Sequence, residues 1–496
     1  MQMNFQRLLE GAEVLAQQGD AGITGLDYDS RRVKPGFAFV AMRGDSTDGN
    51  RFIDKAIAAG AAAVVSDSTT ETPRAGVAWA QVQHGRRALA RLSANFYGRP
   101  AEKLQITGIT GTNGKTTTTF IVESILRAAG RKNVLVGTVE YHLPNATLPA
   151  PHTTPESLEL NQMFARAVSE GATEAVMEVS SHALAQQRVF GIPFDVAIFS
   201  NLTRDHLDYH KTMDEYFASK RILFEGCGTE PPRLAVSNCD DEYGRKLIEF
   251  SKKHSSQVFT YGLERGDFHT QRLDIGTGGN RFDLVTPTGT LPLFSPMRGR
   301  VNVYNVLAAS AAAYARGCSL DEISRGVIAL ERVPGRFESV DEGQPFSVVV
   351  DYAHTDDALK NLTSLAREFV AKAGGQVITV FGCGGDRDRA KRPLMGEAAG
   401  NGSNFVVLTS DNPRSEDPLA IMNDALLGLQ RTRTPYVLEP DRRKAIAKAL
   451  GEAKAGDIVL IAGKGHEKTQ TTREGVFPFD DFSVAREELN RLGYAK

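Results

Sequence analysis

The chain has 496 residues, enough for two to four domains, and its 41% hydrophobic and 24% charged content is ordinary for a globular protein. A formal net charge of −2 excludes a global basic field for nucleic acid, and no segment resembles a signal peptide or the roughly 18 apolar residues of a membrane span. The four cysteines lack C-x-x-C pairing, so we expect a cytoplasmic protein with free thiols, no nucleic-acid partner and no membrane span.

The first hundred residues alternate short strands and helices. Residues 36–42, GFAFVAM, predict a strand, and residues 51–67 predict a helix that runs into a strand. Residues 29–36, DSRRVKPG, form a short polar loop whose simplest interpretation is a solvent-facing basic turn. Residues 95–104 are polar and contain Gly and Pro, which is typical of a boundary. We therefore expect a small α/β domain over residues 1–102.

The clearest local pattern is ITGITGTNGKTTTTF, residues 106–120. It predicts a strand, a glycine-rich turn and a helix that opens with Lys and Thr, an arrangement that cradles phosphates with backbone N–H groups and the positive end of the helix dipole. Lys115 would reach the terminal phosphates, and the Thr116 hydroxyl would bind Mg²⁺. The strict P-loop pattern is not met, because Ile109 replaces its first glycine, and a turn with a helix-capping Thr is the alternative. We expect an ATP-binding loop made of Gly111, Thr112, Asn113, Gly114, Lys115, Thr116 and Thr117.

Further buried-type strands follow this loop, and one of them ends in a carboxylate. They are residues 133–139, 174–180, 195–202 and 233–238. Glu178 lies at the end of the second strand, close to where the phosphates would lie. A carboxylate there suits Mg²⁺, which takes oxygen ligands, although a salt-bridged Glu is an equal alternative. With a second boundary at residues 332–338, we expect a central parallel-sheet ATPase domain over residues 103–333.

The last block predicts four buried strands that each run into a polar or glycine-rich tail. Ligands of open parallel sheets bind beyond the carboxyl ends of the strands, so these tails should meet at one edge. We expect a Rossmann-like α/β domain over residues 334–496, and an α/β protein of three domains in all. The four segments are residues 346–354, 377–386, 405–414 and 457–467.

Many of these segments together resemble the Mur ligase family, which also includes folylpolyglutamate synthase. The similar motifs occur in order over nearly the whole chain. The resemblance implies a three-domain, ATP- and Mg²⁺-dependent ligase that forms amide bonds and acts as a monomer on small-molecule substrates. The motifs include DSRRVKPG (29–36), GTNGKTT (111–117), MEVSSHALAQQRV (177–189), NLTRDHLDYH (201–210), VPGRFE (333–338), DYAHT (351–355), GCGGDRDRAKRPLM (382–395), DNPR (411–414) and AGKGHE (462–467).

The resemblance is strongest to the family activity that adds the third amino acid of the peptidoglycan precursor. It implies transfer of meso-2,6-diaminopimelate to the D-glutamate of UDP-N-acetylmuramoyl-L-alanyl-D-glutamate through an acyl phosphate. Arg414 fits this substrate, because a guanidinium can grip a second carboxylate with two parallel hydrogen bonds. A simple Asn-Pro turn is the structural alternative. By resemblance, diaminopimelate would be bound by Arg387, Asp411, Asn412, Pro413, Arg414, Gly463 and Glu467.

The family motifs imply roles for three other groups of residues. UDP-muramoyl-peptide binding would involve Tyr28, Ser30, Asp45, Ser46, Thr47, His152, Thr153, Thr154, Ser180, Gln186 and Arg188. ATP binding would add Asn302, Arg336 and His354 to the glycine-rich loop. Catalysis would depend on Lys115, Glu178, His206, Lys220, Arg336 and Asp351. The metal ligands would be Thr116, Glu178, His206 and Lys220 as a carbamate.

Some of these positions keep a second interpretation or depart from the family pattern. From the residues alone, Lys220 is better interpreted as a solvated helix lysine, and only the resemblance favours the carbamate. Gln186 could belong to a structural helix face. The family more often has His where this chain has Asn50, Asn where it has His152, and Pro where it has Asp356.

Three rival functions remain at this point. The chain could be folylpolyglutamate synthase or another Mur ligase, although its DSRR and DNPR motifs weigh against this. It could be a P-loop switch that hydrolyses a nucleotide without making a bond, or a sugar-nucleotide binding module alone. Product analysis separates these functions, because only a ligase makes a new amide.

Overall fold

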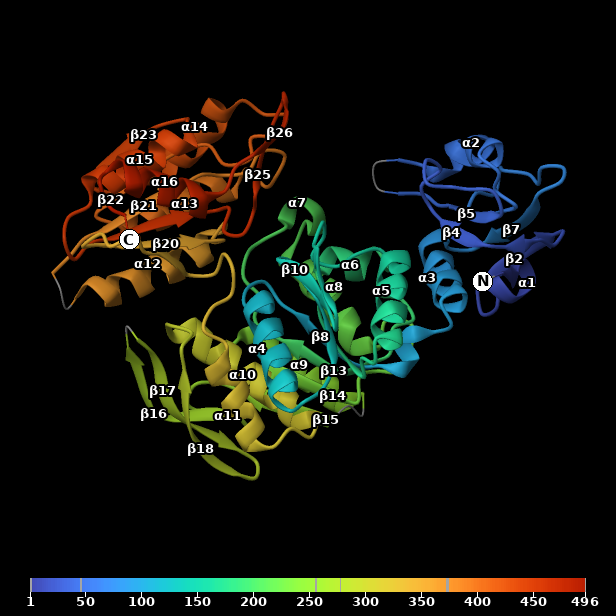
Figure 1. Cartoon of the computed structure of the whole chain (residues 1–496), viewed down its shortest axis with the longest axis horizontal. Helices are drawn as coiled ribbons and strands as arrows, with labels where there is room; N and C mark the ends of the chain where they lie inside the picture. The colour runs from blue at the N-terminus through green and yellow to red at the C-terminus, as the bar shows by residue number, and fades with distance from the viewer. Residues whose placement is uncertain (1, 45–46, 255–256, 277, 372–373, 496) are drawn as a thin grey trace.

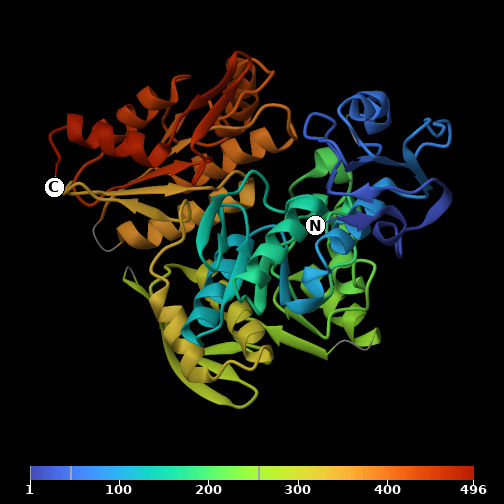
Figure 2. The same ribbon diagram turned by 45° about the vertical axis from the view of Figure 1, so that its right-hand side comes forward.

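The computed structural model describes residues 2–44, 47–254, 257–276, 278–371 and 374–495. It contains three α/β regions in chain order, with the N-terminal and C-terminal regions each next to the central one (Figures 1 and 2). This confirms the predicted fold class, while the predicted domain bounds remain predictions. Among the described residues, no helix combines the length and the apolarity needed to cross a membrane.

The N-terminal region contains a five-stranded sheet in the order β2-β7-β6-β5-β4, in which only β2 is antiparallel to its neighbour. Because β4 and β5 are parallel, Tyr28 and Ser30, which follow β4, lie at the same sheet edge as residues 42–44, which follow β5. The elements are β1 (Met3–Asn4), α1 (Phe5–Leu8), β2 (Val14–Gln18), β3 (Gly22–Ile23), β4 (Gly25–Asp27), β5 (Phe37–Ala41), α2 (Ile53–Ala58), β6 (Ala63–Ser66), β7 (Ala78–Val82) and α3 (Gly85–Phe96).

The central region is built on an eight-stranded sheet in the order β11-β10-β9-β12-β8-β13-β14-β15. Strands β9 to β15 of this order are parallel, and the hairpin of β10 and β11 is antiparallel. The strands are β8 (Gln105–Thr110), β9 (Asn133–Val136), β10 (Glu140–Leu143), β11 (Ala146–Pro149), β12 (Glu174–Glu178), β13 (Phe194–Phe199), β14 (Leu234–Asn238) and β15 (Gln257–Tyr261).

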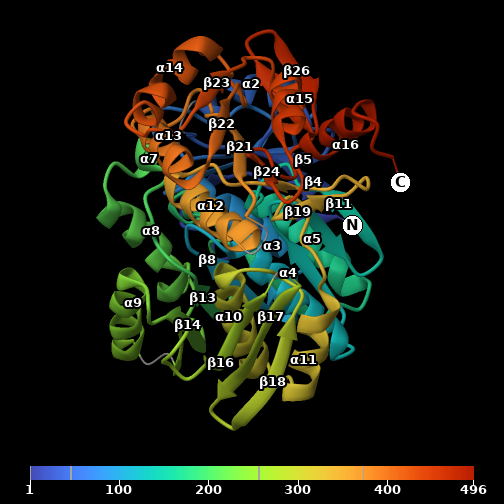
Figure 3. The ribbon, with the colours of Figure 1, turned by 90° about the vertical axis from the view of Figure 1, so that its left-hand side faces the viewer.

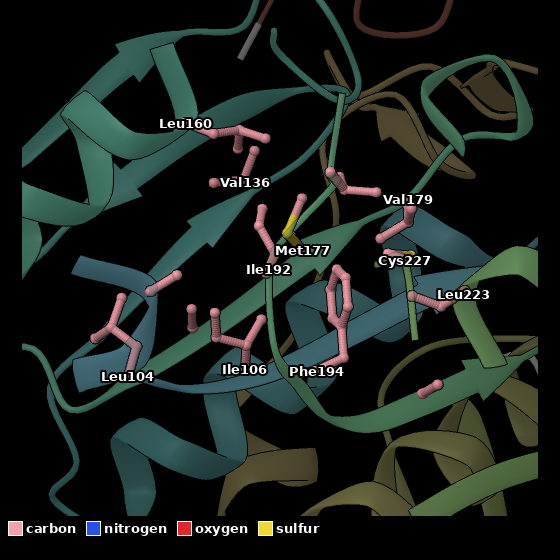
Figure 4. Packing of buried hydrophobic residues seen from close by; sticks show 14 of the residues in the cluster. Leu104, Ile106, Val136, Leu160, Met177, Val179, Ile192, Phe194, Leu223 and Cys227 are labelled. Atoms are coloured by element: carbon pink, nitrogen blue, oxygen red, sulfur yellow. The ribbon is translucent and has the colours of Figure 1, made fainter. Parts of the chain in front are cut away.

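Helices cover both faces of this sheet, which explains why its strands are apolar throughout rather than alternating. On β8, Ile106 packs into the core that Figure 4 shows, together with Met177 and Phe194, whereas Ile109 packs into the core on the opposite face. The helices are α4 (Lys115–Ala128), α5 (Ser157–Ser169), α6 (Ser181–Ala185), α7 (Leu207–His210), α8 (Met213–Glu225), α9 (Glu242–Lys253), α10 (Arg300–Ala315) and α11 (Leu320–Ala329).

A separate three-stranded antiparallel sheet packs against the second core and was not predicted from the sequence. It consists of β16 (His269–Gly276), β17 (Gly279–Thr286) and β18 (Gly289–Ser295), and Figure 3 shows it below the C-terminal region. Phe282 and Leu284 of β17 are buried against α10 and α11, so only one face of this sheet contributes to a core.

The C-terminal region has a six-stranded sheet in the order β19-β20-β24-β21-β22-β23, in which only β19 is antiparallel. Its strands are β19 (Glu338–Val340), β20 (Ser347–Asp351), β21 (Val377–Phe381), β22 (Phe405–Leu408), β23 (Tyr436–Leu438) and β24 (Ile458–Ala462), followed by the hairpin of β25 (Thr469–Thr472) and β26 (Gly475–Pro478). Its helices are α12 (Asp356–Ala371), α13 (Lys391–Gly402), α14 (Pro418–Leu429), α15 (Arg442–Glu452) and α16 (Asp481–Arg491). The four predicted strands β20, β21, β22 and β24 are thus neighbours, and their tails meet at one edge.

Candidate active site

The predicted ATP loop forms a tight turn between β8 and α4. Gly111 and Gly114 have φ angles of 142° and 87°, and a Cβ at either position would overlap the Ser200 hydroxyl or the Asn305 amide oxygen. Glycine is therefore required at both positions, because the loop packs closely against the segment after β13 and against α10. The Lys115 ammonium donates to the carbonyls of Gly111 and Thr112 at 3.0 and 2.8 Å, so it lies across the loop where phosphates would bind. Burial lowers the pKa of Lys115.

Glu178 lies beside the first turn of α4, as the sequence predicted. Its Oε2 accepts hydrogen bonds from the hydroxyls of Thr116 and Thr138 at 3.1 and 3.0 Å, and its Oε1 accepts from the Thr138 backbone N–H at 2.7 Å. Thr138 in turn lies 3.1 Å from the Thr153 hydroxyl. The loop hydroxyl and the carboxylate thus form a compact group of oxygen atoms.

These oxygen atoms suit Mg²⁺. Magnesium in phosphate-transfer sites keeps several waters and takes only one or two carboxylates, with phosphate oxygens as further ligands. Among the described residues, no three His, Cys, Asp or Glu side chains form a metal-binding group. A magnesium ion that takes most of its ligands from water and phosphate does not need such a group. Thr116 and Glu178 fit the ion, whereas the predicted ligand roles of His206 and Lys220 remain predictions.

Arg336, at the start of the C-terminal region, reaches into the central region. Its guanidinium donates to the Thr116 hydroxyl at 3.0 Å and lies over the Tyr352 ring. Asp351 fixes this connection, because its two carboxylate oxygens accept the backbone N–H groups of Phe337 and Ala353 at 2.7 and 2.8 Å. The arginine is therefore held at the metal and phosphate position by the segment that joins the two regions.

Lys220 is buried, which rules out its interpretation as a solvated helix lysine. It is 1% exposed, its ammonium donates to the carbonyl of Gly111 at 2.8 Å, and it lies over the Tyr216 ring. Burial and the neighbouring Lys115 lower its pKa well below the usual value. A neutral amine is the form that reacts with carbon dioxide, so this environment is compatible with the predicted carbamate.

His206 lies at the boundary of the central and C-terminal regions. Burial lowers its pKa to about 3, and its Nε2 is 3.3 Å from Asp205. Asp205 is also 3.5 Å from the Lys391 ammonium and 3.8 Å from the His354 ring, both on the C-terminal region. Asn113 of the loop makes a second link, since its amide donates to Asp357 at 2.9 Å. The C-terminal region is therefore seated directly on the ATP loop.

A cavity of about 710 Å³ lies between the two regions and collects most of the predicted ATP-side residues. It extends from the loop to α10 and α12, far enough to take a nucleoside beyond the phosphates. The predicted residues that line it are Thr112, Asn113, Gly114, Lys115, Thr116, Thr117, Thr153, Glu178, Ser180, His206, Asn302, Arg336, Asp351 and His354.

The cavity also contains residues that the sequence did not single out. Thr138 follows β9 and Asn201 follows β13, so both lie at the carboxyl edge of the sheet, where the strand-end rule could have placed them. Asp205 belongs to the quoted NLTRDHLDYH motif. Asn305 and Asp357 lie in α10 and α12, inside the segments NVYNVLAA (302–309) and DYAHTDDAL (351–359), but neither was given a role.

The predicted muramoyl-peptide residues form a network next to this cavity. The Thr154 hydroxyl donates to the carbonyl of Glu178 at 2.9 Å, and Arg188 donates to the carbonyl of Thr154 at 3.0 Å and to Gln186 at 2.7 Å. The carbonyl of His152 accepts from the hydroxyl of Tyr141, so its contact here is made by the backbone.

The predicted uridine residues lie in the N-terminal region. The Tyr28 hydroxyl donates to Glu159 of α5 at 3.1 Å, which connects this region to the central one. Ser30 is buried and Thr47 is exposed, while Asp45 and Ser46 lie outside the described residues. Asn50 is buried and donates to Asp48 and Asp67, so this departure from the family pattern serves to hold the base of the loop.

The predicted diaminopimelate residues converge at the carboxyl edge of the C-terminal sheet. Gly463 leaves room for the Asp411 carboxylate, because a Cβ there would lie 2.8 Å from its Oδ2. The Asn412 amide donates to Glu467 at 2.8 Å, and Asn412 accepts the backbone N–H of Thr471. The seven predicted residues therefore lie close together at this sheet edge, in a cluster that we call the C-terminal pocket, and none of them lines the large cavity.

Two arginines of this pocket have no acidic partner among the described residues. Arg414 donates to the carbonyl of Gly385 at 2.7 Å, and Arg387 donates to the carbonyl of Asp386 at 2.9 Å. Burial and the neighbouring Arg387 lower the pKa of Arg414. Asp411, Glu467 and Asp386 act on Arg414 from farther away without forming an ion pair with it, so its planar donors could still take the carboxylate of a ligand.

A partly buried charged cluster supports the ATP helix away from the ligands. The ring of His142 on β10 lies 2.8 Å from both Glu123 of α4 and Glu140. Burial acts to lower the pKa of His142, but the two carboxylates outweigh it and the pKa is raised.

Three family models match the chain in order. Mur ligase family, catalytic domain, matches residues 22–97; Mur ligase middle domain matches residues 109–313; and Mur ligase, glutamate ligase domain, matches residues 335–465. They agree with the resemblance that the sequence motifs indicated.

Two similar relatives share one name. The UDP-N-acetylmuramoyl-L-alanyl-D-glutamate–2,6-diaminopimelate ligase of Solibacter usitatus is 53% identical, covering 95% of this chain and 94% of its own. The protein of that name from Geobacillus thermodenitrificans is 46% identical, covering 94% and 95%.

Solved structures lead to the same family. A structure of a ligase with that name is 35% identical and covers 100% of both chains with a TM-score of 0.68. The MurF ligase of Thermotoga maritima, solved in complex with ADP, is 20% identical with a TM-score of 0.66 over 94% of this chain and 98% of its own, and it supports the fold alone. With relatives of this identity along almost its entire length, the chain belongs to the Mur ligase family.

Proposed function

We propose that this chain is an ATP-dependent ligase that joins meso-2,6-diaminopimelate to the D-glutamate of UDP-N-acetylmuramoyl-L-alanyl-D-glutamate. The observation that carries the proposal is the pocket in which the guanidinium groups of Arg387 and Arg414 lack an acidic partner among the described residues, while Asp411 and Glu467 lie close by. Diaminopimelate carries a carboxylate and an ammonium group at its distal end, which such a pocket can pair. The name that the two relatives share supports the same substrates.

The reaction requires an activated carboxylate, because a carboxylate oxygen is a poor leaving group. An oxygen of the D-glutamate carboxylate attacks the γ-phosphorus of ATP, ADP leaves, and an acyl phosphate forms. The diaminopimelate amine then attacks the acyl carbon, and phosphate leaves with the oxygen that came from the carboxylate. A proton from the amine is released as the amide forms.

This chain's residues act mainly by alignment and charge neutralisation. Lys115 exchanges its loop carbonyls for phosphate oxygens, and Arg336 stays at the phosphate position from the C-terminal side. Thr116 and Glu178 would hold Mg²⁺, which supplies positive charge to the phosphates when bound. Seating of the C-terminal region on the loop would exclude water that could hydrolyse the acyl phosphate.

Lys220 is proposed to carry the carbamate that the family resemblance implies. Its amine adds to carbon dioxide to give a carbamate and a proton, which turns a buried cation into an anion near the loop. The cytoplasm is the proposed compartment, since ATP is available there and the four cysteines are unpaired. One chain holds all three ligand regions, so a monomer is the proposed catalytic unit.

The test is a reaction of the purified protein with UDP-muramoyl dipeptide, ATP, Mg²⁺ and separate amino acids, analysed by mass. We expect ADP, phosphate and a tripeptide product formed most efficiently with meso-diaminopimelate. ADP without an amide would instead indicate a nucleotide switch. Turnover driven best by L-glutamate or D-alanyl-D-alanine would indicate folylpolyglutamate synthase or another Mur ligase.

A further inference from the structure

Lys464 belongs to the quoted AGKGHE motif but received no predicted role, and its side chain is buried inside the C-terminal pocket. It lies between Gly463 and Gly465, whose φ angles of 118° and 53° turn the chain sharply after β24. The backbone N–H of Gly463 donates to the carbonyl of Asp351 at 3.1 Å, which fixes the start of the turn. As a result the Lys464 side chain points into the protein and is 0% exposed.

Three oxygen atoms surround the Lys464 ammonium, and all belong to residues of the proposed diaminopimelate pocket. The ammonium donates to Asn412 Oδ1 and Glu467 Oε2, both at 3.1 Å, and lies 3.5 Å from Asp411 Oδ1. The Asn412 amide donates to the same Glu467 oxygen at 2.8 Å. Oε2 of Glu467 is thereby occupied, and Oε1 is the oxygen that can accept a hydrogen bond from a substrate ammonium.

Asp411 depends on this lysine for its charge balance. Its Oδ1 is buried and has no hydrogen-bond partner, so the Lys464 ammonium 3.5 Å away is its ion-pair partner, and Arg414 and Arg442 add to this compensation from farther away. A buried carboxylate without such compensation is strongly unfavourable. The Lys464 side chain is fully buried and cannot touch solvent. Its charge therefore acts on the substrate through Asp411, Asn412 and Glu467.

The charges of the pocket balance only if Lys464 is counted. Arg387, Arg414 and Lys464 supply three positive charges, and Asp411, Glu467 and the neighbouring Asp386 supply three negative charges. A neutral amino acid with two ammonium and two carboxylate groups suits such a balanced pocket. Loss of the Lys464 charge would leave one negative charge in excess, which favours an amino acid of net positive charge such as lysine.

We propose that Lys464 is a positioning residue that orients Glu467 and Asn412 and sets the net charge by which the pocket selects diaminopimelate over lysine. This inference rests on the proposed function, because it concerns the amino-acid substrate of the same site. It adds a buried residue that acts through the groups that touch the substrate.

The direct test is Lys464→Met, which keeps the length of the side chain and removes its charge. Diaminopimelate and lysine are offered together, and the two tripeptide products are quantified by mass. We expect the ratio of the two kcat/KM values to shift toward lysine by about tenfold, with KM for diaminopimelate raised by a similar factor, as for one charge-assisted interaction of about 1.4 kcal/mol. KM for ATP and KM for the UDP-dipeptide should stay within about twofold of the wild-type values, because Lys464 shares no partners with the residues that bind these two substrates.

Lys468→Met is the matched control, because Lys468 lies on the same segment, is 66% exposed and pairs with Asp480 at the surface. It should leave the product ratio unchanged. Asp411→Asn provides a test in the opposite direction that does not depend on folding of the lysine variant. It leaves one positive charge in excess in the pocket, so the remaining activity should discriminate more strongly against lysine.

The outcomes separate this inference from the proposed function. A wild-type protein that makes no diaminopimelate product refutes the function itself. A working wild type with an unchanged ratio in Lys464→Met, or with weaker discrimination in Asp411→Asn, overturns the role of Lys464 and leaves the function standing.

Discussion

Replacing Arg414 by Ala gives the sharpest test of how the amino acid is recognised. The side chain is half-buried, and it donates to the carbonyl of Gly385, so truncation removes a charge from the pocket and a tie between the loops after β21 and β22. Losing one partner of a buried, hydrogen-bonded charge pair costs about 2 to 5 kcal/mol. Because Arg414 is only partly buried and Arg387 remains, we expect the lower end, about 2 kcal/mol, which corresponds to about a 30-fold loss in kcat/KM for diaminopimelate.

Steady-state kinetics with each substrate varied in turn measure this effect. KM for diaminopimelate should rise, whereas KM for ATP should not change, since the pocket is separate from the ATP cavity. Arg414→Lys keeps the charge but loses the planar pair of donors, so its loss should be intermediate. Arg431→Ala removes an arginine that is 60% exposed on the same region and should behave as wild type. Unchanged diaminopimelate kinetics in Arg414→Ala would refute this account of recognition.

Three further changes probe the ATP loop, the support of the pocket and the charged cluster behind the loop. Lys115→Ala should abolish turnover while circular dichroism and the unfolding temperature stay close to wild type, and a fully active variant would contradict the phosphate role of this lysine. Arg442→Met leaves Asp481 buried without its partner, because both side chains are 0% exposed and 2.6 Å apart; we expect a loss of about 3 to 5 kcal/mol in the free energy of unfolding, and a loss below about 1 kcal/mol would show that this pair is not needed. For His142, the raised pKa means that its pairing stabilises the fold fully below the unfolded-state pKa of about 6.5 and that this contribution is lost as pH rises through the folded-state pKa. Denaturant unfolding of wild type should therefore show this loss above about pH 6.5, and His142→Gln should remove it; identical pH profiles would contradict the assignment.

The fold was predictable where strands are buried on both faces. Continuous apolar runs such as residues 174–180 and 457–467 indicated parallel strands, and the strands β12 and β24 lie within these two runs. The antiparallel sheet of residues 269–295 was missed, because only one of its faces contributes to a core and its pattern of buried positions is irregular. The core against which this sheet packs is completed by α10 and α11, which follow it in the sequence, so no local signal reveals it.

Site residues were predictable where they lie at the ends of strands. They were less predictable where tertiary packing determines which way a side chain points. The loop around Lys115 could be predicted from residue type and spacing. For Glu178 they predicted its place at a strand end, while its role as a magnesium ligand stayed one of two alternatives. The burial of Lys220 could not be predicted from the sequence. Its ammonium is paired with the carbonyl of Gly111, which lies far away in the sequence, and only the folded structure brings the two together. Lys464 was missed for a similar reason, since the two flanking glycines that turn it inward also occur in exposed loops.

The central claim, that the protein activates the D-glutamate carboxylate by phosphorylation before the amine attacks, can be tested by isotope transfer. The UDP-dipeptide is labelled with ¹⁸O in that carboxylate and incubated with ATP, Mg²⁺ and meso-diaminopimelate. The account predicts one labelled oxygen in each phosphate released, in equal amount to the tripeptide product. Phosphate without label alongside normal product formation would contradict an acyl phosphate, and release of phosphate without any tripeptide would contradict the ligase itself.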